Sequence, residues 1–238
     1  MNARKTLLTL TLALSALGAG AQEATIRKAL AERVPQMAKI DEISKTPMNG
    51  LYEIRIGNEV LYTDADGNFL IQGELIDTRT RRNLTEERID KLTAIDFNSL
   101  PLKDAFTLVR GNGKRKLAVF EDPNCGYCKR FEKDLAQVKD VTVYLFLYPI
   151  LGNDSVEKSK AIWCSKDRAK AWQDWMIRDV PLAAAADKCD TSAITRNVEL
   201  GRKHRVNGTP ALILTDGTRI PGAIRTEQIE KALAEAKL

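Results

Sequence analysis

Cys125 and Cys128 are separated by Gly126 and Tyr127, at a point where an apolar strand pattern gives way to a helical one. A cysteine in the first turn of a helix lies beside unpaired backbone N–H groups and the positive end of the helix dipole, and both favour an anion. The thiolate is the form of cysteine that attacks a disulfide. A second cysteine one turn further along can resolve the mixed disulfide that results. The spacing therefore predicts thiol–disulfide exchange, with Cys125 as the nucleophile.

Other interpretations of the pair fit less well. A zinc site needs a second pair of ligands at suitable spacing, but Cys164 and Cys189 are far apart and the single histidine, His204, is elsewhere. A structural disulfide stays open, although so short a loop constrains little chain, which favours a redox role. A Cys–His hydrolase dyad of Cys125 and His204 would leave Cys128 without a role. We expect no metal and no cofactor.

The sequence has four cysteines, which allow three pairings. The natural pairing joins the close pair and leaves Cys164 with Cys189. This second pair is either a structural staple or a second redox pair. We favour the staple, because neither cysteine has a near partner and closing a loop of this size stabilises a fold by about 3 kcal/mol.

The first 21 residues have the pattern of a secretory signal peptide. Arg4 and Lys5 precede an apolar run from Leu7 to Leu17, and Ala19-Gly20-Ala21 supplies small residues for cleavage. A membrane anchor is the other interpretation, but a span needs ~20 apolar residues. We expect cleavage after Ala21 and export, with no stable membrane insertion afterwards. Disulfides persist in proteins that are exported from the reducing cytosol.

The chain of 238 residues has a formal charge of +5, and its hydrophobic fraction of 44% is ordinary for a protein with a buried core. The positive excess is mild and spread over many positions. Nucleic-acid binding would need a clustered basic face, so we expect no nucleic-acid partner.

Residues 22–83 read as a small unit with one helix and short strands. A helix is expected at 24–34, ended by Pro35, with strands at 51–56, 59–63 and 68–76. Gly57-Asn58 is typical of a two-residue hairpin turn. A unit of ~60 residues is marginal alone, and a second copy of itself is the simplest partner. A connecting helix from Leu84 to Phe97, capped by Thr85, is expected to follow within a linker at 84–103.

From Asp104 onward, strand and helix patterns alternate, which is typical of an α/β fold. Strands are expected at 106–109, 117–120, 141–148, 211–214 and 219–220, and helices at 125–138, 155–177, 192–204 and 226–237. Gly208-Thr209-Pro210 directly precedes one strand, and proline suits the first residue of a strand because it donates no ladder hydrogen bond. A proline in such a tight turn is either cis or an ordinary loop proline.

From about Glu23 to the C-terminus, the chain resembles the DsbC/DsbG family of thiol:disulfide interchange proteins, in the thioredoxin superfamily. The resemblance rests on Cys125-Gly126-Tyr127-Cys128, on Ala161-Ile162-Trp163-Cys164, on Gly208-Thr209-Pro210-Ala211 and on Gly50-Leu51-Tyr52-Glu53. It implies a periplasmic homodimer. Each subunit would have an N-terminal dimerisation domain (22–83), a linker helix (84–103) and a thioredoxin-like catalytic domain with a helical insertion (104–238).

The resemblance also assigns roles. Cys125 would be the nucleophile and Cys128 the resolving cysteine. Thr209 and Pro210 would form a cis-proline loop that binds substrate, and Cys164–Cys189 would be a structural disulfide. The implied substrates are misfolded or misoxidised exported proteins, whose incorrect disulfides would be isomerised or reduced. A membrane reductase of the DsbD type would supply electrons.

Three alternatives stay open. The DsbG branch carries Cys-Pro-Tyr-Cys, so Gly126 favours the isomerase branch over a reductase of sulfenylated cysteines with holdase activity. A monomeric oxidase like DsbA and a holdase with an incidental disulfide are the others.

Thioredoxin has a buried acid in the strand before its motif; residues 117–120 here contain none, and a proton-accepting role of Glu121 is open.

Overall fold

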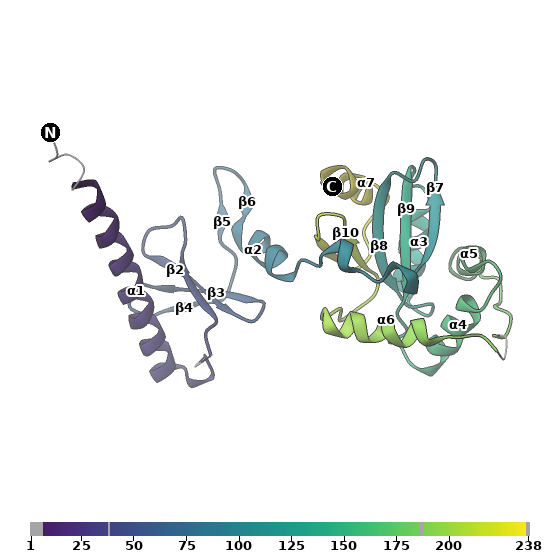
Figure 1. The fold of residues 1–238 in the computed structure, drawn as a ribbon, viewed down its shortest axis with the longest axis horizontal. Helices are drawn as coiled ribbons and strands as arrows, with labels where there is room; N and C mark the ends of the chain where they lie inside the picture. The colour runs from purple at the N-terminus through teal and green to yellow at the C-terminus, as the bar shows by residue number, and fades with distance from the viewer. Residues whose placement is uncertain (1–6, 38, 186–187, 237–238) are drawn as a thin grey trace. The chain divides into compact units, whose positions relative to one another are not determined.

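The computed structural model describes residues 7–37, 39–185 and 188–236. Contacts divide the chain into two compact units, one up to Leu92 and one from Thr93 onward (Figure 1). The domain limits expected from the sequence, 22–83, 84–103 and 104–238, stay a prediction. So does the signal peptide at 1–21: residues 1–6 lie outside the described residues, and helix α1 (Leu7–Arg33) begins directly after them.

The first unit packs α1 against a four-stranded antiparallel sheet in the order β1-β2-β3-β4. The strands are β1 (Glu42–Lys45), β2 (Leu51–Ile56), β3 (Glu59–Asp64) and β4 (Leu70–Ile71). Ile26 and Leu30 of α1 pack with Ile54 and Leu61 in its core. The hairpin expected at Gly57-Asn58 is confirmed, with Ile56 opposite Glu59 and Gly57 at φ 62°.

The strand expected at 68–76 is wrong in extent. Only β4 and, after Gly73, β5 (Ile76–Asp77) are extended, and β5 pairs with β6 (Arg82–Asn83) instead of joining the main sheet. The Asp64 carboxylate accepts the N–H groups of Asn68 and Phe69, which turns the chain at the start of the segment.

Helix α2 (Leu84–Thr93) ends before the expected Phe97, and Thr85 is not its cap. The Asp96 carboxylate accepts from the Asn98 N–H and starts a separate short helix, η2 (Phe97–Ser99). The Asn83 side chain accepts the Glu86 N–H at the start of α2. Thr85 is buried, and its hydroxyl accepts from the Leu75 N–H at 2.8 Å.

The second unit is built on a five-stranded sheet in the order β11-β10-β8-β9-β7. The strands are β7 (Phe106–Arg110), β8 (Arg115–Glu121), β9 (Val141–Leu147), β10 (Ala211–Leu214) and β11 (Arg219–Pro221). β8 and β9 are parallel, and the other neighbours are antiparallel. β7 and β8 flank the Asn112-Gly113 turn without pairing, because β9 lies between them.

Helices pack around this sheet, in teal, green and yellow in Figure 1. They are α3 (Gly126–Leu135), α4 (Asn153–Trp163), α5 (Arg168–Arg178), α6 (Ser192–Lys203) and α7 (Thr226–Glu235). The single helix expected at 155–177 is two helices, because Asp167 caps α5 through the Lys170 N–H. The α/β class expected for this region is confirmed.

The alternation of side chains along β8 separates two apolar clusters. Leu117 and Val119 pack with residues of α3 and α7 on one face. Ala118 and Phe120 pack on the other face, with residues of α6 alongside. The strand therefore carries a buried residue at every position from Leu117 to its end, and its last residue points toward α3.

Candidate functional site

Cys125 is the N-cap of α3, as the spacing predicts. Its backbone is extended, with φ −76° and ψ 116°, and its sulfur accepts the Cys128 N–H at 3.3 Å. One of the orphan donors at the start of the helix is thereby satisfied by the sulfur that would carry negative charge. Both cysteines are free and buried, with Cys125 6% exposed and Cys128 fully covered.

The buried Asp122 carboxylate fixes the loop between β8 and α3. It accepts from the backbone N–H of Asn124 at 2.8 Å, of Ile150 at 2.8 Å and of Leu151 at 2.9 Å, and from the Ser155 hydroxyl at 2.7 Å. One side chain thus joins the residues before Cys125 to the segment that leads into α4. Such preorganisation holds a reacting sulfur in place.

The two thiols have opposite acidities. A hydrogen bond from the Cys128 side chain is the main cause that lowers the pKa of Cys125 to about 5; burial opposes the shift. Burial raises the pKa of Cys128 far above its ordinary value, and the neighbouring Cys125 raises it further. At neutral pH Cys125 is therefore a thiolate and Cys128 a thiol. The ionised Cys125 sulfur is therefore suited to attack a disulfide, whereas the Cys128 sulfur is unreactive while it stays protonated.

The structure brings Thr209 and Pro210 to Cys125, although they lie far away in the sequence. The Thr209-Pro210 peptide bond is cis. In its protonated form, the Cys125 sulfur donates to the Thr209 carbonyl oxygen at 3.2 Å. Pro210 is buried, directly before β10.

Trp175 lies beside the loop between β8 and α3, and two lysine side chains lie over its ring. Its indole Nε1 donates to the Pro123 carbonyl oxygen at 2.6 Å. The ammonium groups of Lys129 and Lys158 lie 4.6 and 4.5 Å from the ring centroid. Tyr127, between the two cysteines, is 63% exposed and so lies open to a partner.

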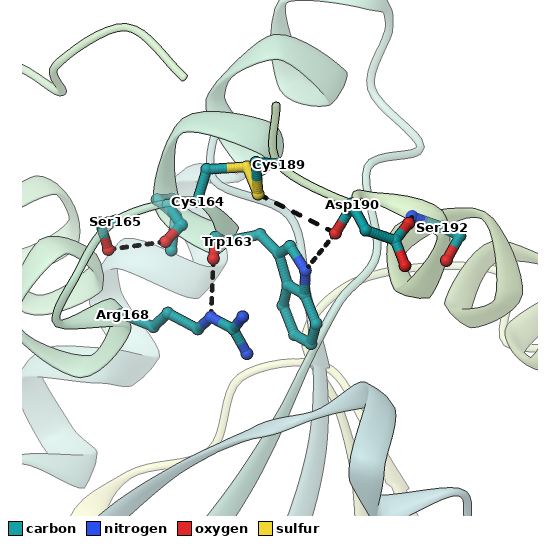
Figure 2. Close-up of a disulfide and its surroundings, with 8 residues drawn as sticks. Trp163, Cys164, Ser165, Arg168, Cys189, Asp190 and Ser192 are labelled. Carbon is teal, nitrogen blue, oxygen red and sulfur yellow. Dashed lines mark hydrogen bonds between the residues drawn. A yellow bond between two sulfur atoms is a disulfide. The ribbon is translucent and has the colours of Figure 1, made fainter. Parts of the chain in front are cut away.

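Cys164 and Cys189 form a disulfide, which joins the end of α4 to the segment before α6. Figure 2 shows it beside the Trp163 indole, whose Nε1 donates to the Asp190 carbonyl oxygen at 2.9 Å. The Arg168 guanidinium stacks 3.7 Å from the Trp163 ring centroid and donates to the Trp163 carbonyl oxygen. The disulfide is thus surrounded by hydrogen-bonded and stacked side chains.

Sequence reasoning missed Glu132, which lies fully buried in α3 one turn after Cys128. Its position four residues after Cys128, on the apolar face of that helix, was the available signal. Glu121, considered from the sequence, is also fully buried. His204 is the C-cap that follows α6, and its carbonyl oxygen accepts from Arg219.

No group of three or more His, Cys, Asp and Glu side chains in residues 7–37, 39–185 and 188–236 could hold a metal ion. In the same ranges, no helix combines the length and the apolar character needed to cross a bilayer.

Two family models match the chain. Residues 102–237 match a thioredoxin-like domain, and residues 18–86 match a disulfide bond isomerase protein N-terminal domain. Together they extend over both units.

Named relatives agree with this match. A probable thiol:disulfide interchange protein DsbC of Bordetella parapertussis is 44% identical over 194 residues, which cover 82% of this chain and 68% of the relative. The thiol:disulfide interchange protein DsbC of Escherichia coli is 31% identical over 223 residues, with 91% and 89% covered. A crystal structure of a disulfide interchange protein from Neisseria gonorrhoeae superposes with a TM-score of 0.54 at 39% identity, over 58% of this chain and 98% of that one.

The cysteine pair at the start of α3, the sheet that supports it and these matches lead to one assignment. The protein belongs to the DsbC family of thiol:disulfide interchange proteins and is a disulfide isomerase.

Proposed function

We propose that Cys125 is the nucleophile of this isomerase and that Cys128 is its resolving cysteine. The observation that carries the proposal is the placement of the two sulfurs: the Cys125 sulfur at the start of α3 accepts the Cys128 N–H at 3.3 Å, and Cys128 itself is fully buried. Cys125 at the N-cap of α3 has a pKa lowered to about 5, whereas burial raises the pKa of Cys128. A thiolate and a protected thiol within one helical turn are what a two-step exchange requires.

In the first step the Cys125 thiolate attacks one sulfur of an incorrect substrate disulfide. The substrate S–S bond breaks, a mixed disulfide forms, and the other substrate sulfur leaves as a thiolate. A different substrate thiolate then attacks the mixed disulfide, which gives a new substrate pairing and regenerates the Cys125 thiolate. No net electrons are transferred in this cycle.

If no substrate thiolate attacks, Cys128 resolves the complex. Its thiol loses a proton, its sulfur forms a bond to Cys125 and the bond from Cys125 to the substrate breaks. The substrate sulfur leaves as a thiolate that can take up a proton, so the substrate is reduced by two electrons. The enzyme is then oxidised. We infer that a membrane reductase of the DsbD type reduces it again.

Thr209 and Pro210 are assigned to substrate binding. The Thr209 carbonyl oxygen lies 3.2 Å from the Cys125 sulfur, so a substrate that reaches the sulfur must pass beside this loop. We assign Cys164–Cys189 a structural role.

The working form is proposed to be a homodimer joined through the first unit. β4 is an edge strand of its sheet, and its residues Leu70 and Ile71 are 42% and 48% exposed, beside Phe69 at 70%. Apolar side chains on an open edge favour pairing with a second copy. Export through a cleaved signal peptide, action in the periplasm and misoxidised exported proteins as substrates complete the proposal.

Trapping of the mixed disulfide tests the roles of the two sulfurs. Cys128→Ser should accumulate a covalent complex with a substrate protein that carries incorrect disulfides, and a reducing agent should release it. Cys125→Ser should form none. A complex that forms equally in Cys125→Ser would contradict the assignment.

The dimer has its own test in Ile71→Glu, which places a charge on the β4 edge. We expect a monomer by sedimentation, with unchanged alkylation of Cys125 and poorer isomerisation. A variant that remains a dimer would contradict the proposed interface.

A wild type that reduces sulfenylated cysteines but does not isomerise disulfides would favour the DsbG-like reductase instead.

A further inference from the structure

Four cationic side chains gather where α6 ends. Arg202 and Lys203 are the last two residues of the helix, Arg205 follows it, and Arg219 belongs to β11. The Arg219 guanidinium donates to the carbonyl oxygen of His204 at 2.9 Å and to that of Arg205 at 3.3 Å, which holds it against the end of the helix. These four cations, without His204, are called the basic cluster below.

The basic cluster has no acidic partner. None of its side chains forms an ion pair with a carboxylate in the part of the chain that the structure describes. Of the two acids nearest in the sequence, Asp216 accepts the Thr218 N–H, and Glu199 acts on Arg196. Arg196 itself, earlier on α6, is paired with the buried Asp104. The four charges at the end of α6 are therefore left unpaired.

The single histidine lies within this cluster and adds no charge to it. Burial lowers the pKa of His204, and the charges of Lys203 and Arg219 lower it further. His204 is therefore neutral at neutral pH, and the positive charge belongs to the lysine and the arginines alone.

Helix stability accounts for only part of the basic cluster. Cations in the last turn of a helix offset the negative end of its dipole, and Arg202 and Lys203 are in that position. Arg205 lies beyond the helix, exposed and in the left-handed region with φ 53°. Because like charges repel, four unpaired cations in one small region bring the isolated fold no stability of their own. Such an excess of one sign attracts an anionic partner.

Hydrogen bonds tie the end of α6 to the end of β8, from which the loop to Cys125 begins. The Tyr148 hydroxyl donates to the carbonyl oxygen of Val206, the residue directly after Arg205, at 2.9 Å. The Tyr148 N–H donates to the carbonyl oxygen of Glu121, the last residue of β8, at 2.8 Å. The basic cluster therefore has a fixed place beside the active site.

The path from the cluster to the reacting sulfur is short. The Thr209 carbonyl oxygen lies 3.2 Å from the Cys125 sulfur. Four residues of chain span at most ~14 Å, so the Arg205 backbone lies within about 20 Å of that sulfur. The residues between them, Asn207 and Gly208, are exposed. At 0.01 M salt the Debye length is ~30 Å, so the charge of the cluster acts on a partner that approaches Cys125.

We propose that the basic cluster is a docking surface for acidic polypeptide segments, so that Cys125 attacks disulfides flanked by Asp or Glu faster than disulfides flanked by Lys or Arg. The inference rests on the proposed attack by Cys125 and names the class of substrate that this attack favours. A polypeptide fits better than a lipid surface, because the cluster adjoins the Thr209 loop beside which the substrate disulfide must lie. Complementary charge raises the rate of encounter.

Peptides of different charge test the surface in reduced wild-type protein. Each peptide has one cysteine, activated as its 2-pyridyl disulfide and flanked by three Glu, three Gln or three Lys residues. The Cys125 thiolate attacks the peptide sulfur, the S–S bond breaks, and pyridine-2-thiolate leaves and takes up a proton. Its absorbance gives the rate of the first step in a single turnover at pH 7.

The Glu peptide should react about 10-fold faster than the Gln peptide at 0.01 M salt, at the low end of the ~10–10³-fold range of electrostatic steering. The Lys peptide should react more slowly than the Gln peptide. At 0.5 M salt the three rates should agree within about 2-fold, because the Debye length is then only a few ångströms. Equal rates for the three peptides at 0.01 M salt would overturn the proposal without any variant.

A triple variant, Arg202→Gln with Lys203→Gln and Arg205→Gln, locates the effect. Arg219 is kept because it holds the end of α6. The matched control replaces Lys114, Lys116 and Lys139 by Gln. These exposed lysines lie at the start of β8 and before β9, at the opposite end of the strands from Cys125, and their loss changes the net charge equally.

The preference for the Glu peptide should fall below about 3-fold in the cluster variant and stay near 10-fold in the control. An equal fall in both variants would overturn the proposal, because net charge alone would then explain the preference. Alkylation by uncharged iodoacetamide should match wild type in both. A parallel loss of alkylation in the cluster variant would also overturn it, because the substitutions would then act on the sulfur and not on docking.

Two further outcomes separate this inference from its neighbours. No reaction of Cys125 with any of the peptides would overturn the proposed function as well, whereas normal reaction without a charge preference overturns the docking surface alone. Sedimentation with vesicles of phosphatidylglycerol and phosphatidylcholine tests a membrane. Vesicle binding that the cluster variant loses, together with equal peptide rates, would assign the basic cluster to a lipid surface instead.

Discussion

Replacing Cys128 by alanine should raise the pKa of Cys125. The Cys128 side chain is the largest single cause of the low value, which is about 5. The Cys128 N–H, 3.3 Å from the Cys125 sulfur, is unaffected by the change. The variant therefore isolates one hydrogen bond to a charged sulfur from the helix terminus that surrounds it.

The size of the shift follows from the strength of that bond. A hydrogen bond to a charged group contributes ~1.5–3 kcal/mol, and one pKa unit corresponds to about 1.4 kcal/mol. The pKa of Cys125 should thus rise by about 1–2 units, to about 6–7. At pH 6 the thiolate fraction would fall from ~90% to between ~10% and ~50%, so alkylation should slow about 2- to 10-fold.

The assay is the rate of reaction with iodoacetamide from pH 3 to 9, read by mass spectrometry on reduced protein. Cys128→Ser is the matched control, because its hydroxyl keeps a donor and should give a smaller rise. A midpoint in Cys128→Ala equal to that of wild type would refute the assigned hydrogen bond. A wild-type midpoint near the ordinary value of about 8.5 would refute the geometry of the whole site.

The same pKa has a consequence for stability. A thiol whose pKa is lower in the folded state binds its proton more tightly when unfolded, so the thiolate stabilises the fold as pH rises. Relative to Cys125→Ser, reduced wild type should gain stability between about pH 5 and the unfolded value of about 8.5, and should lose that gain as pH falls through about 5. Urea unfolding at several pH values measures it; a difference independent of pH would contradict the sign.

Three further variants probe the scaffold by urea unfolding. Gly201→Ala should destabilise by ~1–3 kcal/mol, because a Cβ atom there would overlap the buried Tyr148 ring; an unchanged midpoint would contradict this packing. Asp122→Ala should cost ~3 kcal/mol or more, because four donors lose their acceptor; a loss below 1 kcal/mol, about that of a single hydrogen bond, would contradict its role in the loop. Removing both Cys164 and Cys189 should cost ~3 kcal/mol and leave Cys125 alkylation unchanged; slower alkylation would point to a second redox pair instead.

The sequence was sufficient to predict the structure wherever residues that are neighbours along the chain determine it. The hairpin at Gly57-Asn58 follows from turn chemistry that two residues contain. The position of Cys125 at the start of α3 follows from the change of periodicity after Phe120. The end of α1 just before Pro35 follows from the absent N–H of proline.

Tertiary contacts decided what the sequence could not. β9 separates β7 from β8, although a turn links them directly, because strand pairing is a property of the whole sheet. Thr85 resembles a helix cap in the sequence. In the structure its side chain is buried, and its hydroxyl accepts from the Leu75 N–H instead. Glu132 looks like an exposed helical charge, and only the packing of α3 on the sheet shows that it is buried.

Reactivation of a scrambled multi-disulfide protein in a glutathione buffer tests disulfide isomerisation through Cys125 most directly. Wild type should restore activity to the scrambled substrate, and Cys125→Ser should restore none beyond the buffer alone. Reactivation by Cys125→Ser at the wild-type rate would contradict the assignment, because the sulfur at the start of α3 would then play no part in the exchange.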